Sequence, residues 1–76
     1  MKGPEGRDEV LISKLALRVR SLRVQRRWSQ ENLAEMTGLH RNYIGHTERG
    51  DINVGLTNIG KLAQAFDLSI PEFMQL

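Results

Sequence analysis

Apolar residues recur at three- and four-residue steps through the first part of the chain. This spacing predicts the buried stripe of one long helix over residues 8–27. The stripe consists of Leu11, Leu15, Val19 and Leu22. Leu17 and Val24 lie off the stripe, seven residues apart on a shared face. We expect these two residues to pack under another element or to contact a second subunit.

Two short helices are predicted next, over residues 30–37 and 41–49. Ser29 and His40 occupy the positions at which side chains cap a helix N-terminus, and Gly38 ends the first helix in the left-handed conformation. Trp28 is placed to pack against Leu33 across the first cap. The residues expected to face the core are Leu33, Ala34, Met36, Thr37, Leu39, Ile44 and Thr47.

The last third of the chain predicts two more helices, one over residues 56–66 and a short one after Ser69. Ser69 and Glu72 form a capping-box pattern with a proline in the first turn. No segment alternates with a period of two for long enough to form a strand. We therefore expect an all-α, compact five-helix bundle over residues 8–76, preceded by a flexible arm over residues 1–7 whose glycines and proline show no periodicity.

Composition narrows the class of protein. Seventy-six residues form one small core, and without cysteine there are no disulfides or thiolate metal sites. No stretch approaches the roughly 18 apolar residues that a membrane span requires, and the N-terminus has no secretory signal, so a cytoplasmic protein is expected. The net charge of +2 divides into +4 for residues 1–50 and −2 for residues 51–76. A basic half favours a polyanionic partner, although a solvated helix face is an equally good explanation.

The helix predicted over residues 41–49 separates its side chains into two arcs. The outward arc holds Arg41, Asn42, Gly45, His46 and Arg49. Arginine can pair with guanine and asparagine with adenine, and the N-terminal residues of a helix in the major groove lie nearest the bases. An ordinary polar helix face would look the same on the wheel.

Several segments together resemble the Cro/repressor-type (XRE-like) helix-turn-helix family. They are residues 15–34, the sequence Tyr-Ile-Gly-His-Thr-Glu-Arg-Gly at 43–50, residues 53–66, and Leu-Ser-Ile-Pro-Glu-Phe-Met at 68–74. Residues at the spacing of that family are Gln30, Leu33, Ala34, Gly38, Leu39 and Ile44. The resemblance covers about residues 11–74 and implies a lambda-repressor-like fold, with the helix-turn-helix at about 30–49. It also implies sequence-specific binding of duplex DNA and regulation of transcription, as in restriction–modification controllers and phage-type repressors.

The resemblance assigns roles to individual residues. It implies that Arg41, Asn42, Gly45 and His46 read bases. Phosphate contacts are expected from Gln30, Tyr43, Arg49 and Asn53. Glu48 lies on the inward arc, where an unpaired carboxylate would be very costly, and the resemblance pairs it with Arg23 as a buried structural ion pair.

Three residues depart from the pattern of the family. Arg27 occupies a position that is usually glycine, so the first helix is expected to run on or to end differently. Thr47 replaces a larger apolar residue, and its hydroxyl is expected to bond back to the Tyr43 carbonyl. Gly60 stands where a bulkier residue is usual, which allows for a neighbour that approaches closely.

One recognition helix reads too few bases to locate a single site in a genome. A homodimer on an inverted repeat overcomes this limit. The residues expected to contribute to the dimer contact are Ile70, Phe73 and Met74, with help from Leu17 or Val24.

Other functions are less well supported by the sequence. An antitoxin or adaptor that binds mainly protein partners is the alternative, but it would not need the Arg41-Asn42-Gly45-His46 arc. Nothing resembles an activated nucleophile or a carboxylate pair, so we do not expect an enzyme. We expect no metal and no cofactor, because His40 and His46 are turned about 240° apart on a helix.

Overall fold

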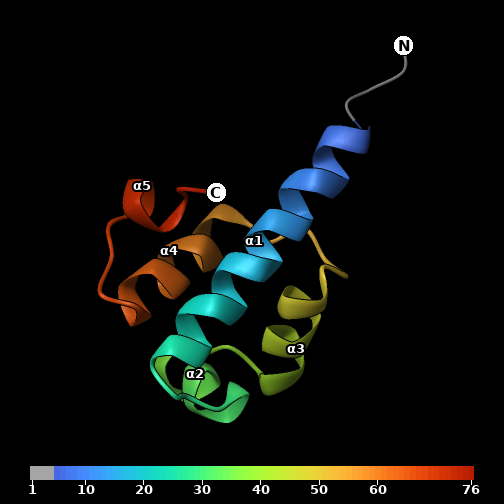
Figure 1. Ribbon diagram of the computed structural model, residues 1–76. Coiled ribbons are helices and arrows are strands. Elements are labelled where there is room, and N and C mark those ends of the chain that lie inside the picture. Colours follow the sequence, from blue (N-terminus) through green and yellow to red (C-terminus); the bar gives the residue numbers. More distant parts are fainter. Residues whose placement is uncertain (1–4) are drawn as a thin grey trace.

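In the computed structural model, which describes residues 5–76, five helices and no strands are present (Figure 1). They are α1 Glu5–Gln25, α2 Gln30–Thr37, α3 Arg41–Arg49, α4 Leu56–Ala65 and α5 Ile70–Phe73. The predicted all-α bundle is confirmed. The helix α1 includes residues 5–7, which were expected to belong to the arm, and the rest of the expected arm lies outside the described residues.

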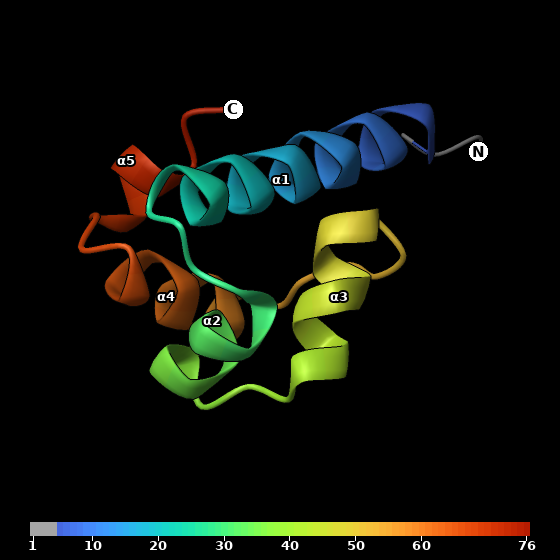
Figure 2. The same ribbon diagram turned by 60° about the horizontal axis from the view of Figure 1, so that its bottom comes forward.

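The helix α1 lies across the other four, as the two views show (Figures 1 and 2). The helices α4 and α5 lie on one side of the molecule, and α3 lies on the opposite side in both views. The N-terminal turns of α1 extend beyond the rest of the bundle (Figure 1). No helix in the described part of the chain is long and apolar enough to cross a membrane.

The core is built around three aromatic rings. Phe66 stacks on Trp28 with ring centroids 5.7 Å apart and on Phe73 with centroids 6.0 Å apart. Aliphatic side chains from four helices and the α3–α4 connection surround these rings, namely Leu15, Val19, Leu22, Leu33, Ile44, Val54 and Leu62. Trp28 therefore packs on the end of α4, an aromatic contact that the expected pairing with Leu33 did not include.

Three residues have a different environment from the one predicted. Leu11, in the N-terminal half of α1, is 53% exposed. Met36 is 52% exposed, on the outer side of α2. Phe73 is fully buried against Phe66, so it belongs to the core and is not available as a dimer contact.

The predicted caps are confirmed. The Ser29 hydroxyl accepts from the Asn32 amide (3.0 Å) and the Asn32 side chain accepts from the Ser29 amide (2.9 Å), which completes a capping box. Ser69 and Glu72 form the same reciprocal pair at α5. Gly38 ends α2 with φ +74°. The caps fix the ends of α2 and α5 through neighbouring residues alone.

The helix α1 ends at Gln25, two residues earlier than predicted. Arg27, at the position where glycine is usual in the family, takes a φ of +59°. The chain therefore makes the left-handed turn without the residue that adopts it most easily. The Trp28 amide then donates to the Arg23 carbonyl (3.1 Å), which closes the turn.

Carbonyl groups at the ends of distant helices are bound by two arginines, Arg18 of α1 and Arg26 directly after it. Arg18 donates from Nε to the Phe73 carbonyl (3.0 Å) and from Nη2 to the Glu72 carbonyl (2.8 Å). Arg26 donates to the Phe66 carbonyl (2.9 Å). The Arg26 guanidinium also lies 5.1 Å from the centre of the Phe66 ring. Part of the basic charge of α1 is thus used within the protein and is not left for a polyanion.

Candidate nucleic-acid interface

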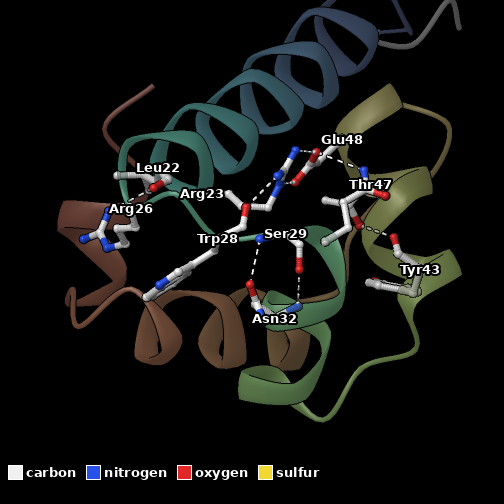
Figure 3. Close-up of polar contacts among 10 residues, drawn as sticks. Leu22, Arg23, Arg26, Trp28, Ser29, Asn32, Tyr43, Thr47 and Glu48 are labelled. Carbon is white, nitrogen blue, oxygen red and sulfur yellow. Dashed lines mark hydrogen bonds and ion pairs between the residues drawn. The ribbon is translucent and has the colours of Figure 1, made fainter.

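The orientation of α3 is fixed by an ion pair with α1. Arg23 donates to both oxygens of Glu48, from Nε at 2.6 Å and from Nη2 at 2.9 Å (Figure 3). The Glu48 side chain is only 4% exposed, so its charge depends on this partner. The hydrogen bonds that Arg23 donates to Glu48 raise the pKa of the Arg23 guanidinium. Arg23 also donates to the Trp28 carbonyl (2.8 Å), which ties the α1–α2 turn to the same centre.

Inward-facing residues of α3 complete the attachment. Ile44 is fully buried and Thr47 is 2% exposed. The Thr47 hydroxyl donates to the Tyr43 carbonyl (2.8 Å), as predicted (Figure 3). With these residues fixed on one side, the exposed side chains of α3 are those of Arg41, Asn42, His46 and Arg49.

The N-terminal end of α3 presents the two residues expected nearest to bases. His40 caps the helix, with its Nδ1 accepting from the Asn42 amide (3.0 Å). Arg41 pairs with Glu31 of α2 at 3.1 Å, and both side chains are more than half exposed. Arg41 and Asn42 are exposed as expected. Glu31 was not singled out from the sequence, because its contact with Arg41 exists only once α2 and α3 are packed.

The C-terminal end of α3 holds a three-residue polar cluster. Arg49 donates from Nε to Asp51 Oδ2 (2.9 Å), and its Nη2 lies 3.1 Å from His46 Nδ1. His46 Nδ1 is 3.2 Å from the same Asp51 oxygen. The pKa of the Asp51 carboxyl is lowered, chiefly by the hydrogen bond from Arg49 and then by the nearby His46 ring. Asp51 was missed in the sequence analysis, although its position two residues after Arg49 and just beyond Gly50 brings it within reach.

Gly45 is buried, although it belongs to the outward arc. The atoms nearest to the place that its Cβ would occupy all belong to the Arg49 guanidinium, the closest being Nη1 at 3.2 Å. The Arg49 side chain therefore folds back over Gly45. Gly45 supports a neighbouring side chain in the structure and is not itself open to a base.

The predicted phosphate-contacting residues are distributed around this arc. Gln30, at the start of α2, donates to Glu48 Oε1 (3.2 Å) and so joins the Arg23–Glu48 pair. Tyr43 is half-buried against the core, and Asn53 is exposed in the α3–α4 connection. Asn53 lies beside the first turns of α1, where it lines a pocket with Asp8 and Leu11.

Two short helices, α2 and α3, are joined by a tight turn at Gly38, and the second helix packs on the core with one side and exposes arginine, asparagine and histidine on the other. This arrangement is that of a helix-turn-helix protein. The helix-turn-helix family model matches residues 19–73. Control protein C.SmaI of Serratia marcescens is 48% identical over 60 residues, which cover 79% of this chain and 71% of that protein.

Solved structures agree with this assignment. The restriction-modification controller protein C.AhdI from Aeromonas hydrophila is 47% identical and superposes with a TM-score of 0.78, over 82% of this chain and 94% of that one. The hypothetical transcription factor NHTF from Neisseria is 40% identical with a TM-score of 0.79, over 88% of this chain and 78% of that one. The chain belongs to the helix-turn-helix family and is a DNA-binding regulator of transcription.

Proposed function

We propose that this protein is a control protein that binds an inverted DNA repeat as a homodimer and regulates transcription from it. The likeness to C.SmaI and C.AhdI supports the role of a restriction–modification controller. The protein acts by binding, in the cytoplasm, and catalyses no reaction. The observation that carries this proposal is the outward face of α3, which exposes Arg41, Asn42 and His46 while the Arg23–Glu48 pair holds the opposite face.

In this proposal Arg41, Asn42 and His46 contact base edges in the major groove, and Gln30, Tyr43 and Asn53 contact phosphates. Bidentate arginine–guanine and asparagine–adenine pairs choose the sequence, whereas phosphate contacts set the register. Glu31 holds the Arg41 guanidinium beside the N-terminus of α3 before DNA arrives. Gln30 keeps a second amide hydrogen for a phosphate while it donates the first to Glu48.

The dimer contact is proposed at α5, with Ile70 at its centre and Met74 beside it. Ile70 is 42% exposed. The helix α5, to which it belongs, lies on the side of the molecule opposite to α3. Leu17 (66% exposed) and Val24 (55% exposed) form a second apolar surface on α1. Phe73 supports α5 from within the core.

The test is a binding titration at several salt concentrations, with a duplex that the protein selects from a randomised library and an unrelated duplex of equal length. We expect Arg41→Ala to cost about 1–3 kcal/mol on the selected duplex and much less on the unrelated one. Gln30→Ala should weaken binding to both duplexes about equally. If Arg41→Ala weakens both duplexes alike, Arg41 is a phosphate contact.

An antitoxin or adaptor that acts through protein partners predicts a different result. The wild-type protein would then show no salt-dependent affinity for either duplex, because no counterions would be released from DNA.

A further inference from the structure

Arg49 was expected to contact a phosphate, but its side chain does not extend along the outside of α3. The guanidinium folds back by one helical turn onto Gly45, with Nη1 3.2 Å from the place of an added Cβ. Any side chain larger than hydrogen at position 45 would occupy part of this space. The group therefore lies on the same outward face as Arg41 and Asn42.

Asp51 holds the guanidinium in this place. It accepts the Nε hydrogen at 2.9 Å, and it lies outside α3, just after the left-handed Gly50. An exposed ion pair of this kind contributes little to stability. Its effect is to restrict the rotamers of Arg49, and a restricted side chain loses less entropy when it binds.

The donors of Arg49 that remain are suited to a base. Nε donates to Asp51, and Nη2 lies 3.1 Å from His46 Nδ1, to which it donates in the tautomer that carries its hydrogen on Nε2. Three of the five guanidinium hydrogens remain, two on Nη1 and one on Nη2. Two adjacent Nη groups match the O6 and N7 acceptors of guanine.

A phosphate is a poorer ligand for the same group. The Asp51 carboxylate contacts Arg49 and His46 together, so a phosphate brought to Arg49 also approaches a negative charge. When Arg49 donates to His46 Nδ1, the neutral imidazole carries its hydrogen on Nε2. His46 is then a second donor beside Arg49.

We propose that Arg49 reads a base in the major groove, and that Asp51 is the residue that positions it over Gly45 for that contact. The inference rests on the proposed function, because it requires that α3 enters the major groove. It adds a second arginine to the reading face, one turn or more from Arg41. It also gives a role to Gly45, which leaves room for the Arg49 side chain.

The first experiment compares three variants of the full chain on the duplex selected by the wild-type protein and on an unrelated duplex, with KCl varied. Arg49→Ala should lower the ratio of the two affinities by roughly 5- to 150-fold. Arg49→Lys keeps the charge but not the planar fork, and it should lower the ratio nearly as much while the salt slope stays unchanged. Arg20→Ala, which removes an exposed charge from α1, is the control and should leave the ratio unchanged.

The positioning role of Asp51 needs its own variants. Asp51→Ala should lower the affinity ratio in the wild-type background and have no effect in the Arg49→Ala background. Asp51→Asn keeps an oxygen that accepts from Nε, so it should retain most of the ratio. The matched control is Asp67→Asn, which should leave the affinity ratio unchanged. Asp67 lies in the turn between α4 and α5, and this turn is on the opposite side of the molecule from α3.

Gly45→Ala gives a readout that a purely structural role does not predict. The added methyl group should raise the thermal stability of α3, because alanine favours helix by about 1 kcal/mol over glycine. It should also displace the Arg49 guanidinium and so lower the affinity ratio. In the Arg49→Ala background it should have no further effect on that ratio.

The outcomes separate the two proposals. If the wild-type protein enriches no duplex sequence, the proposed function fails and this inference fails with it. If the wild-type protein does enrich a sequence, two results would show that Arg49 is a phosphate contact and would overturn only this inference. The first is that Arg49→Lys behaves as wild type. The second is that Arg49→Ala weakens binding to both duplexes equally and reduces the salt slope by about 1. An affinity ratio unaffected by Asp51→Ala would remove the positioning role.

Discussion

Arg27 is a non-glycine residue in the left-handed conformation, with a φ of +59°. An L-residue with a Cβ is strained there by about 1–2 kcal/mol. Replacing it with glycine would remove this strain, but glycine loses more backbone entropy on folding, so the net gain in stability would be smaller. Asp67 has the same φ, but aspartate tolerates the conformation better than arginine does. Arg27 is therefore a position at which the sequence opposes the fold locally.

Arg27→Gly should stabilise the protein by roughly 0.5–1 kcal/mol, because glycine takes this φ without strain. The melting temperature followed by circular dichroism should rise by about 2–8 °C. Arg27→Ala is the control, since it removes the charge but keeps the Cβ. Equal stabilisation by both variants would attribute the effect to charge and not to the backbone.

The buried environment of Glu48 predicts that its substitution lowers the stability of the protein. Glu48→Ala leaves the Arg23 charge without its main partner in a site where Arg23 is only 14% exposed. The expected loss is about 2–4 kcal/mol, below the upper range for buried pairs because Arg23 keeps the Trp28 carbonyl. Thermal unfolding measures it, with exposed Glu35→Ala as the control. An unchanged melting temperature would mean that the pair contributes nothing to stability.

At the scale of elements, one arginine of α1 and one arginine directly after α1 bind the ends of two other helices. Arg26 binds the carbonyl that follows α4, and Arg18 binds two carbonyls at the end of α5. The last carbonyls of a helix have no partner within it, so these arginines satisfy groups that would otherwise need water. A helix as short as α5, with four residues, depends on such contacts.

Arg18→Met should therefore loosen α5 before the rest of the fold. Hydrogen bonds from a charged donor contribute about 1.5–3 kcal/mol, and the substitution removes both while keeping much of the side-chain volume. Hydrogen exchange of the Phe73 and Met74 amides should become at least about tenfold faster, while the core amides of α1 change little. Arg20→Met is the control. Unchanged exchange in α5 would show that Phe73 alone holds the helix.

Local signals in the sequence were sufficient to predict the five helices and their caps. The caps at Ser29, His40 and Ser69 depend on residues two or three positions away, and all three are confirmed. Gly60 is different, since an added Cβ would meet only Ile70 at 3.9 Å, an ordinary contact. The close neighbour suggested for Gly60 is therefore not present among the described residues.

Long-range features were predictable only in part. The Arg23–Glu48 pair was expected, because a carboxylate on the inward arc needs a partner and the family pattern supplies Arg23. Arg18 and Arg26 bind carbonyls 55 and 40 residues away, and no local pattern marks such contacts. The periodicity of α1 also predicted that Leu11 is buried, and this was wrong. Periodicity shows which face of a helix is apolar, but it does not show how far the core extends along that face.

At the scale of the whole molecule, the surface proposed for dimerisation and the recognition helix lie on opposite sides. A dimer contact at α5 therefore leaves α3 uncovered in both subunits, so each copy can offer its α3 to one half-site of an inverted repeat. The dimer contact could lie on α5 or on the apolar surface of α1. Substitutions of Ile70 on α5 and of Leu17 on α1, which are both exposed, distinguish the two.

Ile70→Glu should convert the dimer to a monomer over a range of protein concentrations in sedimentation experiments, because a charge buried in an apolar contact is costly. Leu17→Glu, the same change on α1, should leave the dimer intact. The opposite pattern would place the contact on α1. Binding to the inverted repeat should weaken with the dimer, while binding to random duplex should change less.

The use of arginines as helix caps has a consequence for the behaviour of the protein in salt. Contacts between exposed cations and phosphates weaken steeply as salt rises, because the counterions released on binding must be returned. The bonds from Arg18, Arg23 and Arg26 to carbonyl and carboxylate groups are partly buried, and they are screened much less. A wash in concentrated KCl should therefore strip the protein from a DNA column in folded form, ready to bind again once the salt is diluted.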